Sequence, residues 1–249
     1  MASAVYDRIG TAYADHRRAD PRIAAQIEQA VGSARTVLDV GAGAGSYETG
    51  DRRYTAVEPS SVMLAQRPTG AAPAVQAVAA HLPFADGAFD AAMAVLTVHH
   101  WPDAAAGLAE VRRVTRGAIA VLTWRSDRLA GFWLVAEYLP EAEAHDRTLT
   151  DADRISALLP GSTVQTVSVP HDCTDGFMAA YWRRPEAYLD PAKRAAISGI
   201  ALLDPGAVDR MAERLTADLA DGTWHRRHHD LLDLDSFDHG YRLVVDPGN

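Results

Sequence analysis

The sequence predicts a doubly wound α/β fold, in which helices cover both faces of a mainly parallel sheet. Short apolar and β-branched runs alternate with helical patterns through the first half of the chain. Such alternation favours right-handed βαβ crossovers. A glycine-rich turn, GAGAG, follows the first predicted strand directly, and turns of this kind place ligand sites at the carboxyl edge of a parallel sheet.

Length and composition limit the class of protein. A chain of 249 residues predicts one large domain, or one domain with a sizeable insertion. The content of 48% apolar and 23% charged residues excludes wholesale disorder. A net charge of −9 argues against a nucleic-acid partner. The single cysteine, Cys173, cannot form an internal disulfide and is expected to be a small buried residue.

The chain shows no targeting or membrane signal. The start, MASAVYDRIG, reaches two charged residues before any apolar run develops, which is unlike a secretory leader. The longest apolar stretch, residues 91–98, is far shorter than the ~20 residues that span a bilayer. We therefore expect a soluble, cytoplasmic protein with no membrane partner.

The N-terminal region, residues 5–31, is predicted to be mainly helical, in two pieces. Asp20 followed by Pro21 fits the start of the second piece, with Asp as N-cap and Pro at the first helical position. A narrow apolar stripe at spacing four supports that helix: Ile23, Ile27 and Val31.

Five short runs are predicted as parallel strands: Thr36–Val40, 54–57, 74–78, 89–98 and 118–124. Three helices are expected between them. The first is short, over residues 46–53. The second begins at Ser60 or Ser61 and extends to about residue 66, and the third is capped by Asp103 and extends to about residue 115.

The pattern changes after Trp124. Helical stretches are expected over residues 129–141 and 151–159, and a strand over 162–169. Residues 171–238 then look mainly helical, before a last strand over 241–245. The long intervening stretch exceeds an ordinary loop, so we expect it to form a subdomain or lid.

The strongest motif combines the glycine turn with an acid at the end of the second strand. Gly41, Gly43 and Gly45 allow a tight turn and close approach of a ligand to the backbone. A helix behind the turn would direct free N–H groups at an anionic group. Glu58 can accept hydrogen bonds from both ribose hydroxyls. Together they predict an adenosine site; the alternative is an ordinary turn with a solvent-exposed Glu58.

The resemblance to a known family becomes specific at these residues. VLDVGAGAG resembles the first motif of class I S-adenosylmethionine-dependent methyltransferases, and AVEPSSVM their second. AAHLPFADGAFDAAMAVLTVHHWPD is similar to their LPF…FD…HH segment, and LAEVRRV to the helix that follows. The resemblance covers residues 6–124, and the tail is similar to a bacterial subgroup. It implies a Rossmann-like, seven-stranded sheet with an antiparallel last strand.

The resemblance also implies S-adenosylmethionine as cofactor and S-adenosylhomocysteine as product. Asp39 and the turn residues Gly41, Ala42, Gly43 and Gly45 would surround the methionine end, while Glu58, followed by Pro59, would hold the ribose. Met63 would lie near the adenine. Its edge would be lined by Ala79, Ala80 and His81, and Ala94 and Val95 would offer backbone near the sulfonium. No acid stands at Val78 or Ala80, where the family often has one, so adenine recognition would use backbone groups.

The same reading divides the chain into four parts. Residues 1–33 form N-terminal lid helices, 34–170 the cofactor-binding core, 171–238 a helical insertion that serves as substrate lid, and 239–249 a terminal core strand.

Candidate catalytic residues follow the fourth strand. His99 and His100 would lie at the carboxyl edge of the sheet, where a histidine could remove a proton from an acceptor. Neighbouring strand residues face opposite sides, so one of the two is expected to reach the cleft. Tyr13, on the N-terminal segment, could close the site. The alternative is that both histidines pack beside Trp101 or cap the next helix.

Candidate substrate residues come from the N-terminal segment and the start of the insertion. They are polar groups and rings that could hold a planar or acidic molecule: Arg17, Asp172, Asp175, Tyr181 and Trp182. The alternative is a helix with rings in the core and Arg183 and Arg184 in solvent. The motif WHRRHHD has metal-ligand spacing, but its interleaved arginines would repel a cation, so no metal site is predicted.

The function predicted is methyl transfer to a small molecule, and we favour an oxygen acceptor. A phenol or alcohol would use a histidine, whereas a carboxylate would need only positioning. Three alternatives stay open: another reaction of the same cofactor, such as a cyclisation, an NAD-dependent oxidoreductase, and a non-catalytic binding module. GAGAG places its third glycine one residue earlier than the usual NAD motif, which disfavours the oxidoreductase.

Overall fold

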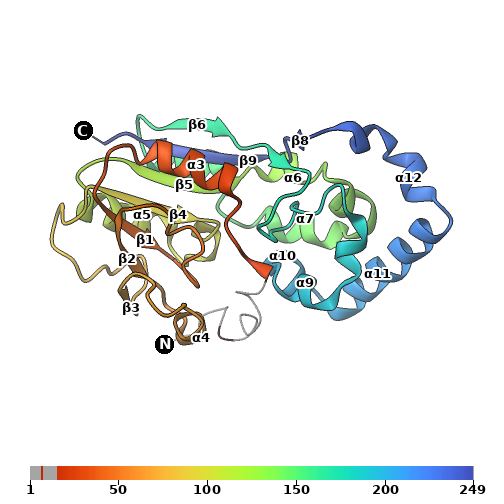
Figure 1. The fold of residues 1–249 in the computed structure, drawn as a ribbon, viewed down its shortest axis with the longest axis horizontal. Coiled ribbons are helices and arrows are strands. Elements are labelled where there is room, and N and C mark those ends of the chain that lie inside the picture. The colour runs from red at the N-terminus through yellow and green to blue at the C-terminus, as the bar shows by residue number, and fades with distance from the viewer. Residues whose placement is uncertain (1–6, 8–15, 249) are drawn as a thin grey trace.

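The computed structural model describes residue 7 and residues 16–248. Its main feature is a seven-stranded sheet with the strand order β3-β2-β1-β4-β5-β9-β6 (Figure 1). The strands are β1 (Thr36–Val40), β2 (Arg53–Val57), β3 (Ala74–Val75), β4 (Ala91–Val95), β5 (Ile119–Trp124), β6 (Thr163–Thr166) and β9 (Tyr241–Asp246). Strand β9 pairs antiparallel with both β5 and β6, whereas the pairs among β1 to β5 are parallel. The predicted fold class is therefore confirmed.

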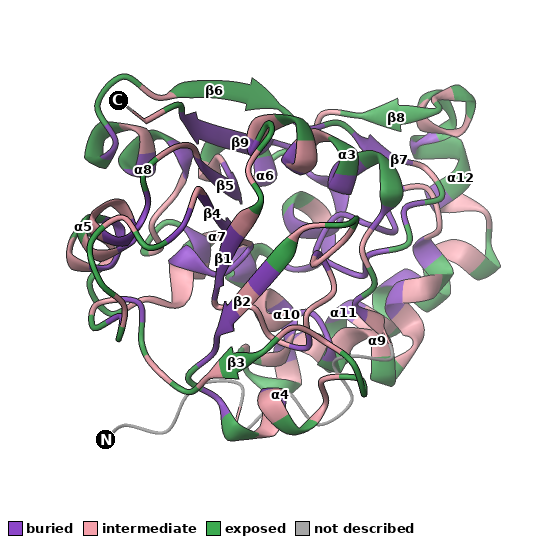
Figure 2. Cartoon of the chain, turned by 60° about the vertical axis from the view of Figure 1, so that its left-hand side comes forward, coloured by how far each residue is buried: buried purple, intermediate pink, exposed green. Residues whose placement is uncertain are grey.

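Two apolar layers cover the sheet. On one face, α3 (Pro21–Ala30) and the second half of the chain pack against side chains such as Val37 and Leu122. On the other face, α5 (Ala104–Val114) and α8 (Ala152–Leu158) pack against the alternate side chains of the same strands, such as Leu38 and Val121. The inner strands β1, β4, β5 and β9 are buried nearly throughout, whereas the edge strand β6 is exposed (Figure 2), as expected for a doubly wound fold.

Three predicted helix starts are confirmed by their caps. The Asp20 carboxylate accepts a hydrogen bond from the backbone N–H of Arg22 at 3.0 Å, with Pro21 in the first turn. Ser60 Oγ accepts from the N–H of Met63 at 3.2 Å and begins α4 (Ser61–Ala65). Asp103 likewise caps α5, by accepting from the N–H of residue 106 at 2.9 Å.

The predicted helix over residues 46–53 is wrong, because the structure shows turns there. Side-chain contacts hold this segment instead. Arg52 donates hydrogen bonds to the carbonyls of Ala34 and Gly32 at 2.6 Å each. Thr49 Oγ1 donates to Glu28 of α3 at 2.6 Å. These contacts carry the chain directly from the glycine turn into β2.

Two predicted strands are shorter than expected. The fourth ends at Val95, because Leu96 adopts φ 51°, in the left-handed region, and a 3-10 helix follows over Val98–His100. The strand predicted over 162–169 divides into β6 and β7 (Val169–Pro170), because β7 leaves the main sheet and pairs with β8 (Ser236–Phe237). Strand β3 also ends early, at Val75.

The second half of the chain is mainly helical, as predicted, but in short pieces. The stretch predicted over 129–141 is divided into α6 (Ser126–Leu129), a π-helix over Leu134–Tyr138 and α7 (Pro140–Asp146). The region after β7 contains a 3-10 helix (Pro185–Leu189), α9 (Pro191–Ala195), α10 (Ser198–Ala201), α11 (Pro205–Ala220), α12 (Thr223–Arg227) and a 3-10 helix (His229–Asp233). Figure 1 shows α9, α11 and α12 gathered on one side of the molecule. No helix within the described residues is long and apolar enough to cross a membrane.

Candidate functional site

The glycine turn joins β1 to the neighbouring strand at the carboxyl edge of the sheet. The N–H groups of Gly41 and Ala42 both donate to the carbonyl of Val57, at 2.8 and 3.1 Å. Gly41 has φ 74°, and a Cβ there would stand 2.0 Å from Oγ1 of Thr97. Glycine at this position is therefore required both by the backbone conformation and by the close approach of the segment after β4.

Glu58 lies inside the site rather than in solvent. Its side chain is buried, with the residue 5% exposed, so the alternative of a solvent-exposed Glu58 is wrong. One carboxylate oxygen accepts a hydrogen bond from the N–H of Gly43 at 2.9 Å, and the other accepts from the N–H of Ser60 at 2.9 Å. Burial raises the pKa of Glu58 above its usual value, while these two N–H donors oppose the rise. The carboxylate thus lies directly against the glycine turn.

A buried ion pair that sequence reasoning missed supports the turn from behind. Arg67 Nη2 donates to both oxygens of Glu48 at 2.7 Å, and both side chains are nearly inaccessible. The same nitrogen donates to the carbonyl of Ala72 at 3.0 Å. Because no helix forms behind the turn, the free N–H groups expected from one are not supplied there. Burial, followed by the charge of Glu48, raises the pKa of Asp39 well above its ordinary value.

The other residues proposed for the cofactor site differ in how far they are buried. Met63 and Ala79 are buried, Ala80 and Val95 are half-buried, and Ala94 is buried within β4. Pro59 and His81 are exposed. The backbone near the adenine edge is shaped by Glu110, which accepts a hydrogen bond from the N–H of Leu82 at 3.1 Å.

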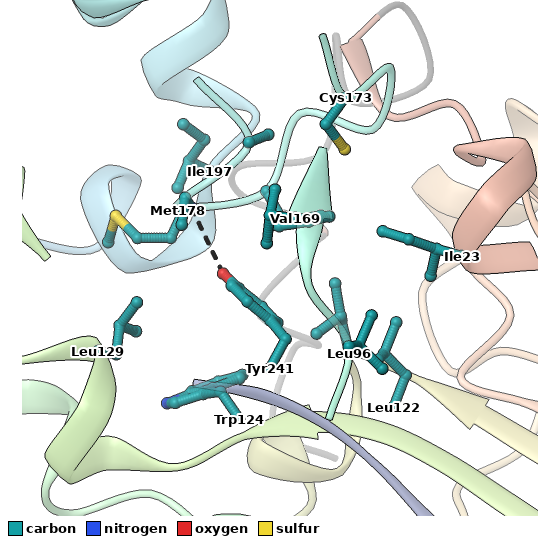
Figure 3. Packing of buried hydrophobic residues seen from close by; sticks show 14 of the residues in the cluster. Ile23, Leu96, Leu122, Trp124, Leu129, Val169, Cys173, Met178, Ile197 and Tyr241 are labelled. Atoms are coloured by element: carbon teal, nitrogen blue, oxygen red, sulfur yellow. Dashed lines mark hydrogen bonds between the residues drawn. The ribbon is translucent and has the colours of Figure 1, made fainter. Parts of the chain in front are cut away.

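A cavity of about 40 Å³ lies between the carboxyl edge of the sheet and the second half of the chain. Figure 3 shows Trp124, Leu129, Met178 and Tyr241 facing one another around this region. The cavity is lined by Arg17, Leu96, His99, Trp124, Leu129, Asp146, Phe177, Met178, Ile197, Ser198, Gly199 and Tyr241. Its walls therefore come from the N-terminal segment, the ends of β4, β5 and β9, and the helical region.

Leu96 connects the cavity to the glycine turn. It is the one non-glycine residue with positive φ in the described part of the chain, which is a strained conformation for a branched side chain. Leu96 lines the cavity, and the next residue, Thr97, approaches Gly41. The segment after β4 therefore holds the cavity and the turn in a fixed relationship.

The two histidines lie on the 3-10 helix, so the expectation from strand alternation does not apply to them. His99 lines the cavity, and its ring lies 4.5 Å from Trp124 and 3.8 Å from His100. His100 is outside the lining. Burial lowers the pKa of His99 well below its ordinary value and that of His100 to about 4. Both imidazoles are therefore neutral near pH 7, the form that accepts a proton.

Asp146 is a cavity residue that sequence reasoning missed. It ends α7 and is 5% exposed. Within the described residues its carboxyl has no hydrogen-bond partner, and burial raises its pKa to about 7. Its position in AEAHD, at the end of a short helix, gives no signal in the sequence, because a carboxylate there is ordinarily solvated.

The structure places the proposed substrate residues in three different settings. Arg17 lines the cavity and forms a buried ion pair with Asp175, which also accepts a hydrogen bond from Tyr47 Oη at 2.9 Å. Asp172 is more than half exposed and pairs with Arg22 at the surface. Tyr181 and Trp182 are buried but do not line the cavity; Trp182 donates to the carbonyl of Val169 at 3.1 Å. Tyr13 lies outside the described residues.

The remaining candidates are structural. Arg183 and Arg184 are half-buried and donate to backbone carbonyls of Leu234 and Cys173, rather than extending into solvent. Cys173 is buried, as expected, and burial raises its pKa to about 12, which makes it a poor nucleophile. Within the described residues there is no group of three or more side chains that could hold a metal ion.

The comparisons with known proteins agree with this arrangement. A family model for a methyltransferase domain matches residues 38–120. A solved structure from Anabaena variabilis, which carries the provisional name of a methyltransferase from an antibiotic biosynthesis pathway, is 31% identical, with TM-score 0.87 over 93% of this chain and 98% of that chain. The chain belongs to the class I S-adenosylmethionine-dependent methyltransferase family. A search of curated proteins finds no significant match.

More distant structures share the fold of this methyltransferase. Geranyl diphosphate C-methyltransferase from Streptomyces coelicolor, crystallised with S-adenosylhomocysteine, is 16% identical, with TM-score 0.50 over 91% of this chain and 77% of that chain. The [4+2]-cyclase SpnF is 17% identical, with TM-score 0.53 over 98% and 94%. The family membership decides against the NAD-dependent oxidoreductase and identifies the cofactor as S-adenosylmethionine. The buried Glu58 carboxylate against the glycine turn fits that cofactor.

Proposed function

We propose that this methyltransferase methylates a small molecule at an oxygen atom. The observation that supports this proposal best is the pair Leu96 and Thr97, which connects a mainly apolar, partly open cavity to the glycine turn. A small cavity lined mainly by apolar side chains favours part of a small molecule over a nucleic acid or a protein surface. The charge of −9 supports the same choice.

The cofactor would be held by the residues of the glycine turn. Glu58 would bind the ribose hydroxyls, and Asp39 with Gly41, Ala42, Gly43 and Gly45 would surround the methionine end. Met63, Ala79 and Ala80 would lie around the adenine. When bound, S-adenosylmethionine supplies an activated methyl group. The protein itself then needs to orient the acceptor and to accept its proton.

His99 is the residue we propose for accepting that proton. It lines the cavity, and its Nδ1 atom is buried with no hydrogen-bond partner in the described part of the chain. His100 would act on His99 through the ring contact at 3.8 Å rather than on the substrate. Tyr13 and the division into lid, core and insertion stay predictions.

The first test is isothermal titration of the purified chain with S-adenosylmethionine, S-adenosylhomocysteine and NAD. We expect about micromolar binding of the first two, a common range for such ligands. A panel of small phenols, alcohols, amines and carboxylates is then incubated with S-adenosylmethionine, and products are identified by mass. Methylated phenols or alcohols, lost in His99→Gln but retained in His100→Gln, support the proposal. Products methylated only at nitrogen or carbon, or a folded protein that binds neither sulfur ligand, overturn it.

A further inference from the structure

Among the described residues that line the cavity, Asp146 carries the one carboxyl group, and the proposed reaction does not use it. Arg17 is paired with Asp175, and His99 is assigned to the acceptor. The Tyr241 hydroxyl accepts a hydrogen bond from the N–H of Ala179 at 3.4 Å, as the dashed line in Figure 3 shows. Asp146, by contrast, is 5% exposed with no partner for its carboxyl among the described residues.

Of the two acceptor groups of Asp146, a cavity residue, the carboxyl is the one that accepts no hydrogen bond from the described residues. The backbone carbonyl is already bonded, because it accepts from the N–H of Leu149 at 3.0 Å and from Ser126 Oγ at 3.4 Å. The carboxyl acts electrostatically on the hydroxyl of Tyr241, which lines the same cavity. A buried carboxyl without a partner costs free energy that a bound hydrogen-bond donor would recover.

We propose that Asp146 is a specificity-determining residue that accepts a hydrogen bond from the substrate, so that the cavity selects a mainly apolar small molecule bearing a hydroxyl or ammonium group. This inference rests on the proposed function and deepens it. The other walls supply the apolar part of the selection: Leu96, Trp124, Leu129, Phe177, Met178 and Ile197.

The chemistry of the walls supports this substrate class. An apolar surround strengthens a hydrogen bond to a carboxyl and excludes competing water. The unbranched side chain of Met178 can change rotamer to widen the small cavity for a ring. The raised pKa of Asp146, about 7, means that a donor that favours the charged form would bind with proton release near neutral pH.

Few charged groups near Asp146 compete with it for a hydrogen-bond donor of the substrate. The other polar groups of the lining residues are Arg17, which is held by Asp175, the neutral His99, the hydroxyls of Ser198 and Tyr241, and the indole N–H of Trp124, which is buried with no hydrogen-bond partner among the described residues. The neighbouring His145, on the same helix, acts electrostatically on His99 and His100. A substrate donor would thus find Asp146 as its strongest acceptor.

The test measures binding to the full chain saturated with S-adenosylhomocysteine, with phenol, benzylamine and toluene as probes. These probes share a ring and differ in the donor. We expect phenol or benzylamine to bind about tenfold or more tightly than toluene, the effect of one hydrogen bond to a carboxylate. In Asp146→Leu the preference should fall to near unity, and Asp146→Asn, which keeps an acceptor oxygen, should restore part of it.

A matched control is Asp209→Leu, which makes the same change at an exposed position of α11. It should leave the preference unchanged. Circular dichroism establishes that each variant is folded; if Asp146→Leu is not, Asp146→Asn and its pH profile decide. Equal binding of all three probes to the wild-type chain, no binding of any, or a preference that survives in Asp146→Leu overturns the inference. Loss of S-adenosylhomocysteine binding, by contrast, would count against the proposed function.

Discussion

The carboxylate of Glu58, at the end of β2, accepts a hydrogen bond from the N–H of Gly43 at 2.9 Å. This contact joins two residues that are 15 positions apart in the chain, just after the ends of β1 and β2. It orients a buried acid toward the glycine turn before any cofactor binds, so little ordering remains to be done on binding.

Replacing Glu58 is expected to weaken cofactor binding. Glu58→Ala removes an acceptor for ribose hydroxyls and leaves the N–H groups of Gly43 and Ser60 without their partner. We expect about a tenfold to hundredfold loss in affinity for S-adenosylhomocysteine, as for one or two charged hydrogen bonds. Isothermal titration measures it. Glu213→Ala, at an exposed position of α11, is the control and should bind normally.

Adding a methyl group at Gly41 is expected to disturb the turn by collision. In Gly41→Ala the new Cβ would stand 2.0 Å from Thr97 Oγ1, at φ 74°. Gly32→Ala is a matched control, because Gly32 has φ 60° with no atom within 4 Å of its Cβ position. The control should lose about 1–2 kcal/mol from backbone strain alone. Urea unfolding should show a larger loss for Gly41→Ala, accompanied by weaker cofactor binding; equal losses would contradict the collision.

The stability of the chain should depend on the protonation of Asp146. Burial raises its folded-state pKa from 3.8 to about 7, so the neutral acid is favoured in the folded state. The stabilising effect of protonation is full below about pH 4 and is lost as the pH rises through 7. Asp146→Asn should therefore be more stable than the wild-type chain at about pH 8, by roughly 2–4 kcal/mol, and should lose this advantage toward about pH 4. Urea unfolding at several pH values tests this, and a parallel pH dependence in both chains would refute it.

Removing one partner of the ion pair between Arg17 and Asp175 should destabilise the fold much more than removing both. Both side chains are buried, and the pair links the N-terminal segment to the start of the insertion. Arg17→Met should cost about 3–5 kcal/mol, because it leaves a buried carboxylate without its cation. The double variant Arg17→Met/Asp175→Leu should recover much of this loss. Arg210→Ala, which breaks an exposed pair with Glu141, should have little effect.

The histidine pair should stay neutral across the physiological range. Burial lowers the pKa of His100 to about 4 and that of His99 well below its usual value. Charging either ring would therefore cost stability only as the pH falls toward those values. The ring proton resonances of both histidines should stay constant between about pH 6 and 8. His99→Gln and His100→Gln assign the resonances, and a titration within that interval would contradict the burial effect.

Local patterns in the sequence determined most of the framework. The caps at Asp20, Ser60 and Asp103 depend only on neighbouring residues, which is why they could be predicted. The strand Thr36–Val40 was predicted with its bounds, because an apolar run that ends in glycine has few alternatives. The helix over 46–53 was wrong because Arg52 binds the carbonyl of Ala34 and Glu48 binds Arg67, and these contacts with residues outside the segment hold it as turns.

In the candidate site, too, some features could be predicted from sequence motifs and others depended on the tertiary structure. The motifs alone indicated the cofactor and placed Glu58 beside the glycine turn. The cavity needed the tertiary structure, because its walls come from residues between Arg17 and Tyr241, which the sequence separates widely. Asp146 looks like an ordinary surface acid in the sequence, and only burial by the surrounding elements removes most of the solvent from its carboxyl. Composition and spacing determine which ionisable groups the chain contains. Desolvation by neighbouring residues in the fold then decides which of these groups have shifted pKa values.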